Sequence, residues 1–500
     1  MSQRTFTAGF LFCGLGAGAL GFLEAMGRLG REHSATFRSL GGIDLDPHSC
    51  ADFRMLTGSP AAEADLATMQ PAELRAAWGD ERPDCIFLSP PCKGFSGLLS
   101  GKSAASPKYQ ALNRLVLQGL FLACETWASP PPLLVLENVP RIQSRGADLL
   151  RQVRQLLASY GYVFHEATHD CGEIGGLAQH RRRYLLVARR PADVPSYVYH
   201  PPKKQVRGCG EVLGPLPLPE DPAAGPLHKL PRLSWINWLR LALIPAGGDW
   251  RDLPKAGAPE LSSPLPEGAE RRSVWARYDV RPWDQPARTV AGEGSNGGYG
   301  VADPRVPYNG HLGVIGWDEP TGVVAGASRP SNGRFAVADP RVAEAVALKC
   351  KPWQTSGAYG VMRWDEAVGT VTGSACIDNC RSAVADPRPP GAPKDSYPII
   401  IAADGTWHRP LTTLELAALQ GIPTVIDGKP LQLSGKRVAA WRERIGNAVP
   451  VGAARAIAES LLTALLAADL GTWTLGGTGI WVERADDRPD EAHLEEEHAA

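Results

Sequence analysis

The sequence of 500 residues has little of three features that would narrow its class directly. Its ten cysteines are too few for a disulfide-stabilised domain, and the closest pair, Cys376 and Cys380, has no neighbouring ligands to complete a zinc set. It has no evident signal peptide or transmembrane run, so we expect a cytoplasmic protein with reduced thiols, no metal and no membrane partner. Its net charge of −1 neither indicates nor excludes nucleic acid.

The charge is unevenly distributed along the chain. Residues 177–240 contain 11 Lys and Arg against 4 Asp and Glu, whereas residues 476–500 contain 2 against 8. A basic stretch beside a site can bind phosphates, although a solvated basic face explains it equally well. The acidic end, which has few apolar residues, predicts disorder over 476–500.

A glycine-rich turn follows the first apolar run. Residues 7–14 lead into Gly14-Leu15-Gly16, and apolar residues then recur at helical spacing. A strand, a tight turn and a helix in this order are typical of the entry to a nucleotide-binding α/β unit. Asp44 falls at the predicted end of a second strand, where a carboxylate accepts hydrogen bonds from ribose hydroxyls. Asp65 falls at the end of a third strand.

The alternation continues beyond these strands. Further strands are predicted to end at Leu88 and to cover 133–139, 164–169 and 183–187, with helices over 109–127 and 148–159. Such alternation predicts an α/β fold with a mostly parallel sheet, and ligands bind at the carboxyl ends of its strands. We therefore expect Gly14, Asp44, Asp65, Cys92 and Glu137 to converge.

The segment Leu88-Ser-Pro-Pro-Cys92 presents one thiol at a turn that two prolines stiffen. A buried cysteine without a chemical role is the simpler interpretation. The motifs upstream and downstream favour a nucleophile instead.

From about residue 191, Pro and Gly are frequent and the strands are short. An internal repeat lies in this region. Its first half begins with Trp-Asp at Trp283, Trp317 and Trp364. Its second half ends with Val-Ala-Asp-Pro-Arg at Arg305, Arg341 and Arg388. The polar loops between the halves contain Asn296, Asn332 and Asn379. We expect the tryptophans to pack in a core and each unit to be a β element with a polar tip.

The order of these motifs resembles the DNA cytosine-C5 methyltransferase family, whose members use S-adenosylmethionine. The resemblance covers residues 9–190 and 406–460 and includes Pro91-Cys92, Glu137-Asn-Val139, Gln179-x-Arg181-x-Arg183 and Gly446-Asn-Ala-Val-Pro450. It implies a Rossmann-like methyltransferase domain over 1–190 and 406–475. The intervening residues 191–405 correspond to an inserted, mostly β target-recognition domain, and 476–500 form the acidic tail.

The resemblance also implies roles for individual residues. The implied cofactor contacts are Phe12, Gly14, Gly16, Asp44, Asp65 and Asn447. The implied catalytic residues are Cys92, Glu137, Arg181 and Arg183. The expected DNA contacts are Lys93, Ser96, Gln179, Asn296, Asn332, Arg334 and Asn379.

These residues suit a reaction at carbon 5 of cytosine. A thiolate from Cys92 that adds to C6 makes C5 nucleophilic. A protonated Glu137 would meet the N3 side of the ring, Arg181 would hold the O2 carbonyl, and Arg183 would support the pocket or a phosphate. The cytosine has to flip out of the duplex for this chemistry.

One departure touches the predicted site, because Lys93 stands where the family usually has Gln. It leaves open which group is transferred. Two other interpretations also stay open: a tRNA cytosine-5 methyltransferase, and a non-catalytic DNA-binding relative. The expected partner is double-stranded DNA, read by a monomer, and the sequence leaves open whether a cognate restriction endonuclease exists.

Overall fold

The computed structural model describes residues 2–91, 107–197, 201–244, 246, 314–315, 336–337, 360–371, 382–388, 400, 402, 406–471 and 482–483. The chain divides into two compact units. The first comprises Met1–Arg207, Gly369–Gly373 and Leu416–Ala500, and the second comprises Gly208–Val368 and Ser374–Glu415. The sequence placed the corresponding boundaries after residues 190 and 405.

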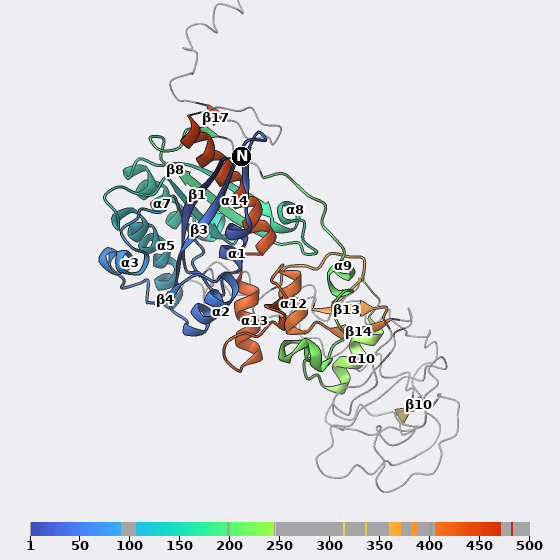
Figure 1. Cartoon of the computed structure of the whole chain (residues 1–500). Helices are drawn as coiled ribbons and strands as arrows, with labels where there is room; N and C mark the ends of the chain where they lie inside the picture. Colours follow the sequence, from blue (N-terminus) through green and yellow to red (C-terminus); the bar gives the residue numbers. More distant parts are fainter. Residues whose placement is uncertain are drawn as a thin grey trace, which may run out of the picture. The chain divides into compact units, whose positions relative to one another are not determined.

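The first unit is built on an eight-stranded sheet in the order β2-β3-β1-β5-β6-β8-β7, with β4 paired to β3 (Figure 1). Its strands are β1 Ser2–Leu11, β2 Gly27–Leu29, β3 His33–Asp44, β4 Ala61–Glu63, β5 Cys85–Leu88, β6 Leu133–Asn138, β7 Val163–Asp170 and β8 Arg182–Arg189. The pairs among β4, β3, β1, β5 and β6 are parallel. This confirms the predicted α/β, Rossmann-like fold.

Two strands interrupt the parallel pattern. β8 is antiparallel to both β6 and β7, and β2 is antiparallel to β3. The link from β7 to β8 contains only the short helix α8, Cys171–Gly175, and the following turn. A parallel pairing needs a longer crossover, so the chain reverses direction here.

Alternate residues of the strands enter two separate cores. Phe10, Phe87 and Val135 belong to one cluster, whereas their neighbours Leu11 and Leu88 belong to the other. This alternation follows from the two-residue period of a strand and explains why the central strands are apolar on both faces.

Helices cover both faces of the sheet. The helices of the first unit are α1 Ala17–Glu24, α2 Pro47–Thr57, α3 Pro71–Trp78, α5 Pro107–Glu125, α6 Ile142–Arg145, α7 Ala147–Ser159, α8, α13 Val438–Asn447 and α14 Val451–Leu470. Side chains from α1, α2 and α14 fill the first core, and those from α3, α5 and α7 fill the second. The stretch Val438–Leu470 is long and apolar enough to cross a membrane, but 72% of its most apolar window is buried inside the protein, as in a core helix.

The second unit contains a three-stranded sheet of β12 Val361–Met362, β13 Ala383–Asp386 and β14 Trp407–Pro410. Its described helices are α9 Cys209–Leu213, α10 Trp235–Leu243 and two 3₁₀ turns over 222–224 and 226–228. Helix α12, Thr413–Leu419, begins in this unit and ends in the first. The side chain of Thr412 and that of Glu415 cap its first turn by accepting from each other's backbone N–H.

The internal repeat has a defined strand pairing. In the third copy, β12 pairs in parallel with β13, and Val361 lies opposite Ala383. In the second copy, β10 Val314–Ile315 pairs in parallel with β11 Ala336–Val337, and Val314 lies opposite Ala336. β10 and β12 each begin three residues before the repeat's tryptophan, so the two copies use the same register. The first copy lies outside the described residues.

The second half of the third repeat is held by a network of ion pairs. Arg388 bonds the carboxylate of Asp386, donates to the carbonyls of Leu213 and Leu216, and stacks on the ring of Trp364 at 5.1 Å. Asp386 also binds Arg409 at 2.8 Å. Arg388 therefore has a structural role, and Trp364 is its packing surface.

The chain end differs from the expected disorder at one place. β17, Val482–Glu483, pairs antiparallel with β9, Ser196–Tyr197. Residues 472–481 and 484–500 lie outside the described residues.

Candidate active site

The turn after β1 is held in left-handed backbone conformations. Phe12, Gly14 and Gly16 have φ values of 55°, 54° and 96°. Glycine adopts such values without a steric penalty. The N–H of Gly14 donates to Oδ2 of Asp44 at 2.9 Å, so the turn is tied to the end of β3.

Asp44 uses both carboxylate oxygens on this edge of the sheet. Oδ2 accepts from Gly14, and Oδ1 accepts from the N–H of Asp46 at 3.0 Å. Burial raises the pKa of Asp44 above its ordinary value, and the two backbone N–H groups only partly offset this effect. A carboxylate oxygen has more than one lone pair, so Asp44 can accept further hydrogen bonds from a ligand.

The surroundings of this turn fit an adenosyl group. A side-chain carbon added to Gly14 would meet no described atom within 4 Å, so the turn borders open space. Leu45, which follows Asp44, is 64% exposed and offers an apolar face for a flat base. Asp65 lies two residues beyond β4, and its Oδ1 accepts from the N–H of Ala67 at 2.9 Å. These residues suit ribose and adenine contacts, and nothing in the sequence pattern had singled out Leu45.

Glu137 lies near the end of β6 and has a bonding partner for each carboxylate oxygen. Nε of Arg183 donates to Oε1 at 2.9 Å, and the hydroxyl of Ser89 donates to Oε2 at 3.0 Å. Glu137 is 6% exposed and the side chain of Arg183 is 14% exposed. Ser89 directly precedes Pro90 and Pro91, so this contact joins Glu137 to the turn that leads to the nucleophile segment. Sequence reasoning missed Ser89, although its place before the two prolines was a usable signal.

Arg181 has a different environment from Arg183. It is 1% exposed, and its guanidinium donates to the carbonyls of Val371, Gly446 and Ala448 at 2.7, 2.9 and 3.0 Å. These carbonyls come from segments far apart in the sequence. The structure thus gives Arg181 a bracing role in place of the predicted contact with O2 of cytosine, and the arginine beside Glu137 is Arg183.

Gln179 is also an internal brace. Its side chain is 0% exposed, Nε2 donates to the carbonyl of Leu419 at 3.3 Å, and Oε1 accepts from the N–H of Val371 at 3.4 Å. Both ends of the amide are bonded within the first unit. The structure therefore gives Gln179 a structural role in place of the predicted DNA contact.

The last motif is held against α2 by a buried ion pair. Nε of Arg444 donates to Asp52 at 2.8 Å, and the N–H of Ser434 donates to the other oxygen of Asp52 at 2.6 Å. Arg444 precedes Gly446, whose carbonyl Arg181 binds, and Asn447 is exposed at the end of α13. Arg444 and Asp52 are 392 positions apart, so no local pattern could have paired them.

The other predicted site residues lie outside the described part of the chain; they are Cys92, Lys93, Ser96, Asn296, Asn332, Arg334 and Asn379.

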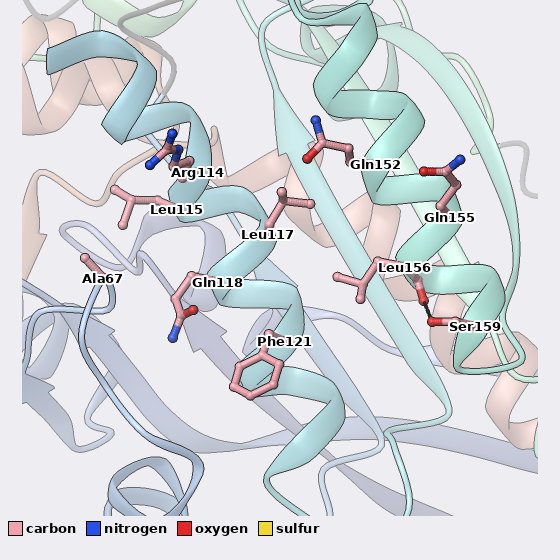
Figure 2. A pocket seen from close by; sticks show the side chains of 10 residues that line it. All are labelled: Ala67, Arg114, Leu115, Leu117, Gln118, Phe121, Gln152, Gln155, Leu156 and Ser159. Atoms are coloured by element: carbon pink, nitrogen blue, oxygen red, sulfur yellow. Dashed lines mark hydrogen bonds between the residues drawn. The ribbon is translucent and has the colours of Figure 1, made fainter. Parts of the chain in front are cut away.

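A pocket of about 870 Å³ opens between α5 and α7 (Figure 2). Leu115, Leu117 and Leu156 give it an apolar lining, with Gln118 and Gln152 beside them. Among the predicted site residues that the structure describes, none lines this pocket, so Glu137, Arg183 and Asp44 are not part of it.

A family model described as C-5 cytosine-specific DNA methylase matches residues 6–207. This part of the chain belongs to that family. The match ends where the first segment of the first unit ends, at Arg207. The methylase domain is therefore of the type that transfers methyl groups to cytosine.

Individual relatives of the methylase chain are distant. Type II methyltransferase M1.HphI of Haemophilus parahaemolyticus is 22% identical over 278 residues, which cover 54% of this chain and 70% of that protein. The structure of Entamoeba histolytica methyltransferase EhMeth is 12% identical, with 94% of this chain and 99% of that chain covered and a TM-score of 0.46. The S. pombe Dnmt2 methyltransferase is 12% identical, with 93% and 99% covered and a TM-score of 0.46. Structural similarities at this level do not identify the substrate.

Proposed function

We propose that the protein is a DNA cytosine-C5 methyltransferase that modifies a flipped cytosine within a specific duplex sequence. The observation that carries this proposal is the Glu137 carboxyl group, which Arg183 and Ser89 hold at the end of β6. Ser89 begins the turn that reaches Pro91 and then Cys92. Attack at C6 of cytosine requires a fixed carboxyl group and a thiol, and Cys92 follows Ser89 by three residues in the sequence.

The thiolate of Cys92 forms a bond to C6 of the cytosine, and the electron pair of the C5–C6 double bond moves into the ring. The Glu137 carboxyl group donates a proton or hydrogen bond at N3, where charge would otherwise build up. Arg183, which holds the same carboxyl group, would meet the adjacent O2 carbonyl. C5 then takes up the methyl group, a base removes the C5 proton, and the Cys92–C6 bond breaks to restore the aromatic ring.

Bound S-adenosylmethionine supplies the methyl group from a positively charged sulfur, which is a good leaving group. Asp44 would hold its ribose hydroxyls, with Gly14 and Gly16 allowing close approach. Leu45 would cover one face of the adenine, and Asp65 would meet its edge. Asn447 lies at the end of α13, in the motif that completes this pocket in the family.

Recognition of the sequence is assigned to residues 191–405, and above all to the polar tips of the repeats. Asn332 and Arg334 are of the types that bond adenine and guanine through two atoms at once. Ser96 and Lys93 would meet the DNA beside Cys92. M1.HphI is a type II methyltransferase, which supports duplex DNA as the substrate and a cognate restriction endonuclease as a partner.

The test is methyl transfer by the purified protein to duplex DNA and, in parallel, to total tRNA. We expect radioactive methyl groups on duplex DNA, and bisulfite sequencing should locate them at cytosines in one sequence context. Transfer to tRNA alone, or methylation at a position other than C5, would overturn the proposal.

A further inference from the structure

At the edge of the sheet that carries Glu137, two exposed arginines are left without an acceptor. Arg182 is the first residue of β8, and Arg141 immediately precedes α6. Both are exposed, and their side chains make no hydrogen bond or ion pair with any residue that the structure describes. Some exposed arginines of this unit have carboxylate partners, such as Arg38 with Glu81.

The two arginines share one end of the sheet. Asn138, the last residue of β6, lies opposite Tyr184, so Arg182 extends two positions beyond that pair. The hydroxyl of Thr168, which lies opposite Tyr184 on β7, donates to Gln143 of α6 at 3.4 Å. This bond places α6 alongside the ends of β7 and β8.

The carboxylates at this edge are already bonded to other groups. Glu137 is held by Arg183 and Ser89, as described above. Asp170 accepts from the N–H groups of Gly172 and Arg181 and pairs with His180 at 2.9 Å.

The next acid along the chain, Glu173, pairs with Lys203 at 2.7 Å. No described acid therefore neutralises Arg141 or Arg182. Two unpaired guanidinium groups at the end of the sheet that carries Glu137 suit backbone phosphates, which the planar guanidinium binds through two hydrogen bonds.

We propose that Arg182 and Arg141 bind backbone phosphates of duplex DNA next to the nucleotide that enters the Glu137–Arg183 site. This inference rests on the proposed function, because it takes duplex DNA as the substrate. Holding the backbone on this side leaves the base free to rotate toward Glu137. Such contacts carry no sequence information, and they fix the position of the DNA.

The test is the salt dependence of binding to a fluorescein-labelled duplex of mixed sequence. Phosphate contacts do not depend on sequence, so the recognised site need not be known. Fluorescence anisotropy gives the affinity at several salt concentrations for wild type, Arg182→Gln, Arg141→Gln and the double variant. Arg31→Gln is the matched control, since Arg31 is exposed and unpaired among the described residues but precedes β3 at the opposite edge of the sheet.

Each lost phosphate contact should reduce the slope of log K against log salt by about 0.9, and the double variant should lose about 1.8. Arg31→Gln should keep the wild-type slope, and all variants should keep the wild-type affinity for S-adenosylmethionine. Wild-type slopes in both single variants and the double variant, with normal duplex binding by wild type, would overturn this inference and leave the proposed function standing. A change in only one single variant would overturn the paired contact, and failure of wild type to bind duplex at any salt would overturn the proposed function as well.

Discussion

Arg181 and Arg183 lie two positions apart in one motif, but their side chains make different contacts. The matched substitutions Arg181→Lys and Arg183→Lys keep the charge and remove the planar fork of donors. Arg181 makes three hydrogen bonds to buried carbonyls, whereas Arg183 reaches the Glu137 carboxyl group from a site that is 14% exposed. We therefore expect Arg181→Lys to act on stability and Arg183→Lys to act on the reaction.

The magnitudes follow from the contacts. A lysine at position 181 cannot donate hydrogen bonds to all three carbonyls. A lost hydrogen bond to a charged group costs about 1.5–3 kcal/mol, so Arg181→Lys should lose about 2–5 kcal/mol of unfolding free energy. At about 2–4 °C per kcal/mol, the melting temperature should fall by roughly 4–20 °C. A lysine at position 183 loses the Nε donor to Glu137, and one preorganised donor at a reacting group is worth about 10²–10³ in kcat.

Two measurements on the same preparations separate these roles. Thermal unfolding gives the stability of each variant, and transfer of tritiated methyl groups to duplex DNA below the lower melting temperature gives kcat. The reasoning is refuted if Arg181→Lys melts like wild type but is inactive, or if Arg183→Lys keeps wild-type kcat. The first result would mean that Arg181 acts on the substrate after all.

Three further predictions address the cofactor, the nucleophile and the second unit. Asp44→Ala should weaken S-adenosylmethionine binding by about one to two decades while leaving duplex affinity within about twofold, and calorimetry with unchanged cofactor affinity would show that Asp44 is misassigned. Cys92→Ala should abolish methyl transfer. Wild type should form a covalent adduct with a duplex that contains a cytosine analogue unable to lose a proton from C5, and the variant should not. Measurable turnover by the variant would exclude the covalent route. Arg409→Met should cost about 3–5 kcal/mol at pH 7, measured by urea unfolding, because it leaves Glu415 and Asp386 buried without that partner. Burial acts to raise the pKa of Glu415, but Arg409 outweighs it and holds that pKa below its ordinary value, so the wild-type pair stabilises the fold above about pH 4.3 and loses this contribution as the pH falls further. In the variant, burial still acts to raise the pKa of Glu415, and Arg409 no longer opposes it. The deficit in unfolding free energy against wild type should therefore shrink between pH 7 and pH 4.5, and a deficit that grows instead would contradict the assignment.

The fold was readable from the sequence where apolar patterns are strong. The run that ends at Leu88 and the run over 133–139 are strands, and the alternation between them and the helices predicted the α/β class. The reversal at β8 was not predicted, because strand direction depends on the length of the connection and not on the pattern within the strand. The pairing of Val482–Glu483 with β9 joins segments almost 290 residues apart, and the acidic composition there predicts the opposite.

The candidate site was predictable by position, and only partly by role. Glu137 and Asp44 lie at strand ends, as the order of the motifs indicated. The different roles of Arg181 and Arg183 were not predictable, because their spacing suggests that they share one face of a strand. β8 begins at Arg182, so Arg181 belongs to the preceding turn and its side chain takes another direction. The contact of Ser89 with Glu137 joins two strands, and such contacts leave no local signature.

The return of residues Gly369–Gly373 to the first unit has a practical consequence for chimeric enzymes. The inserted region looks like a cassette with two junctions, one after Arg207 and one before Leu416. Val371 lies within that cassette, yet its carbonyl and N–H bond Arg181 and Gln179 of the methylase domain. Grafting a foreign recognition cassette at the two outer junctions would therefore delete acceptors and donors that the host domain needs. A graft that keeps Gly369–Gly373 from the host has four junctions, and this design preserves the hydrogen bonds of Val371 with Arg181 and Gln179.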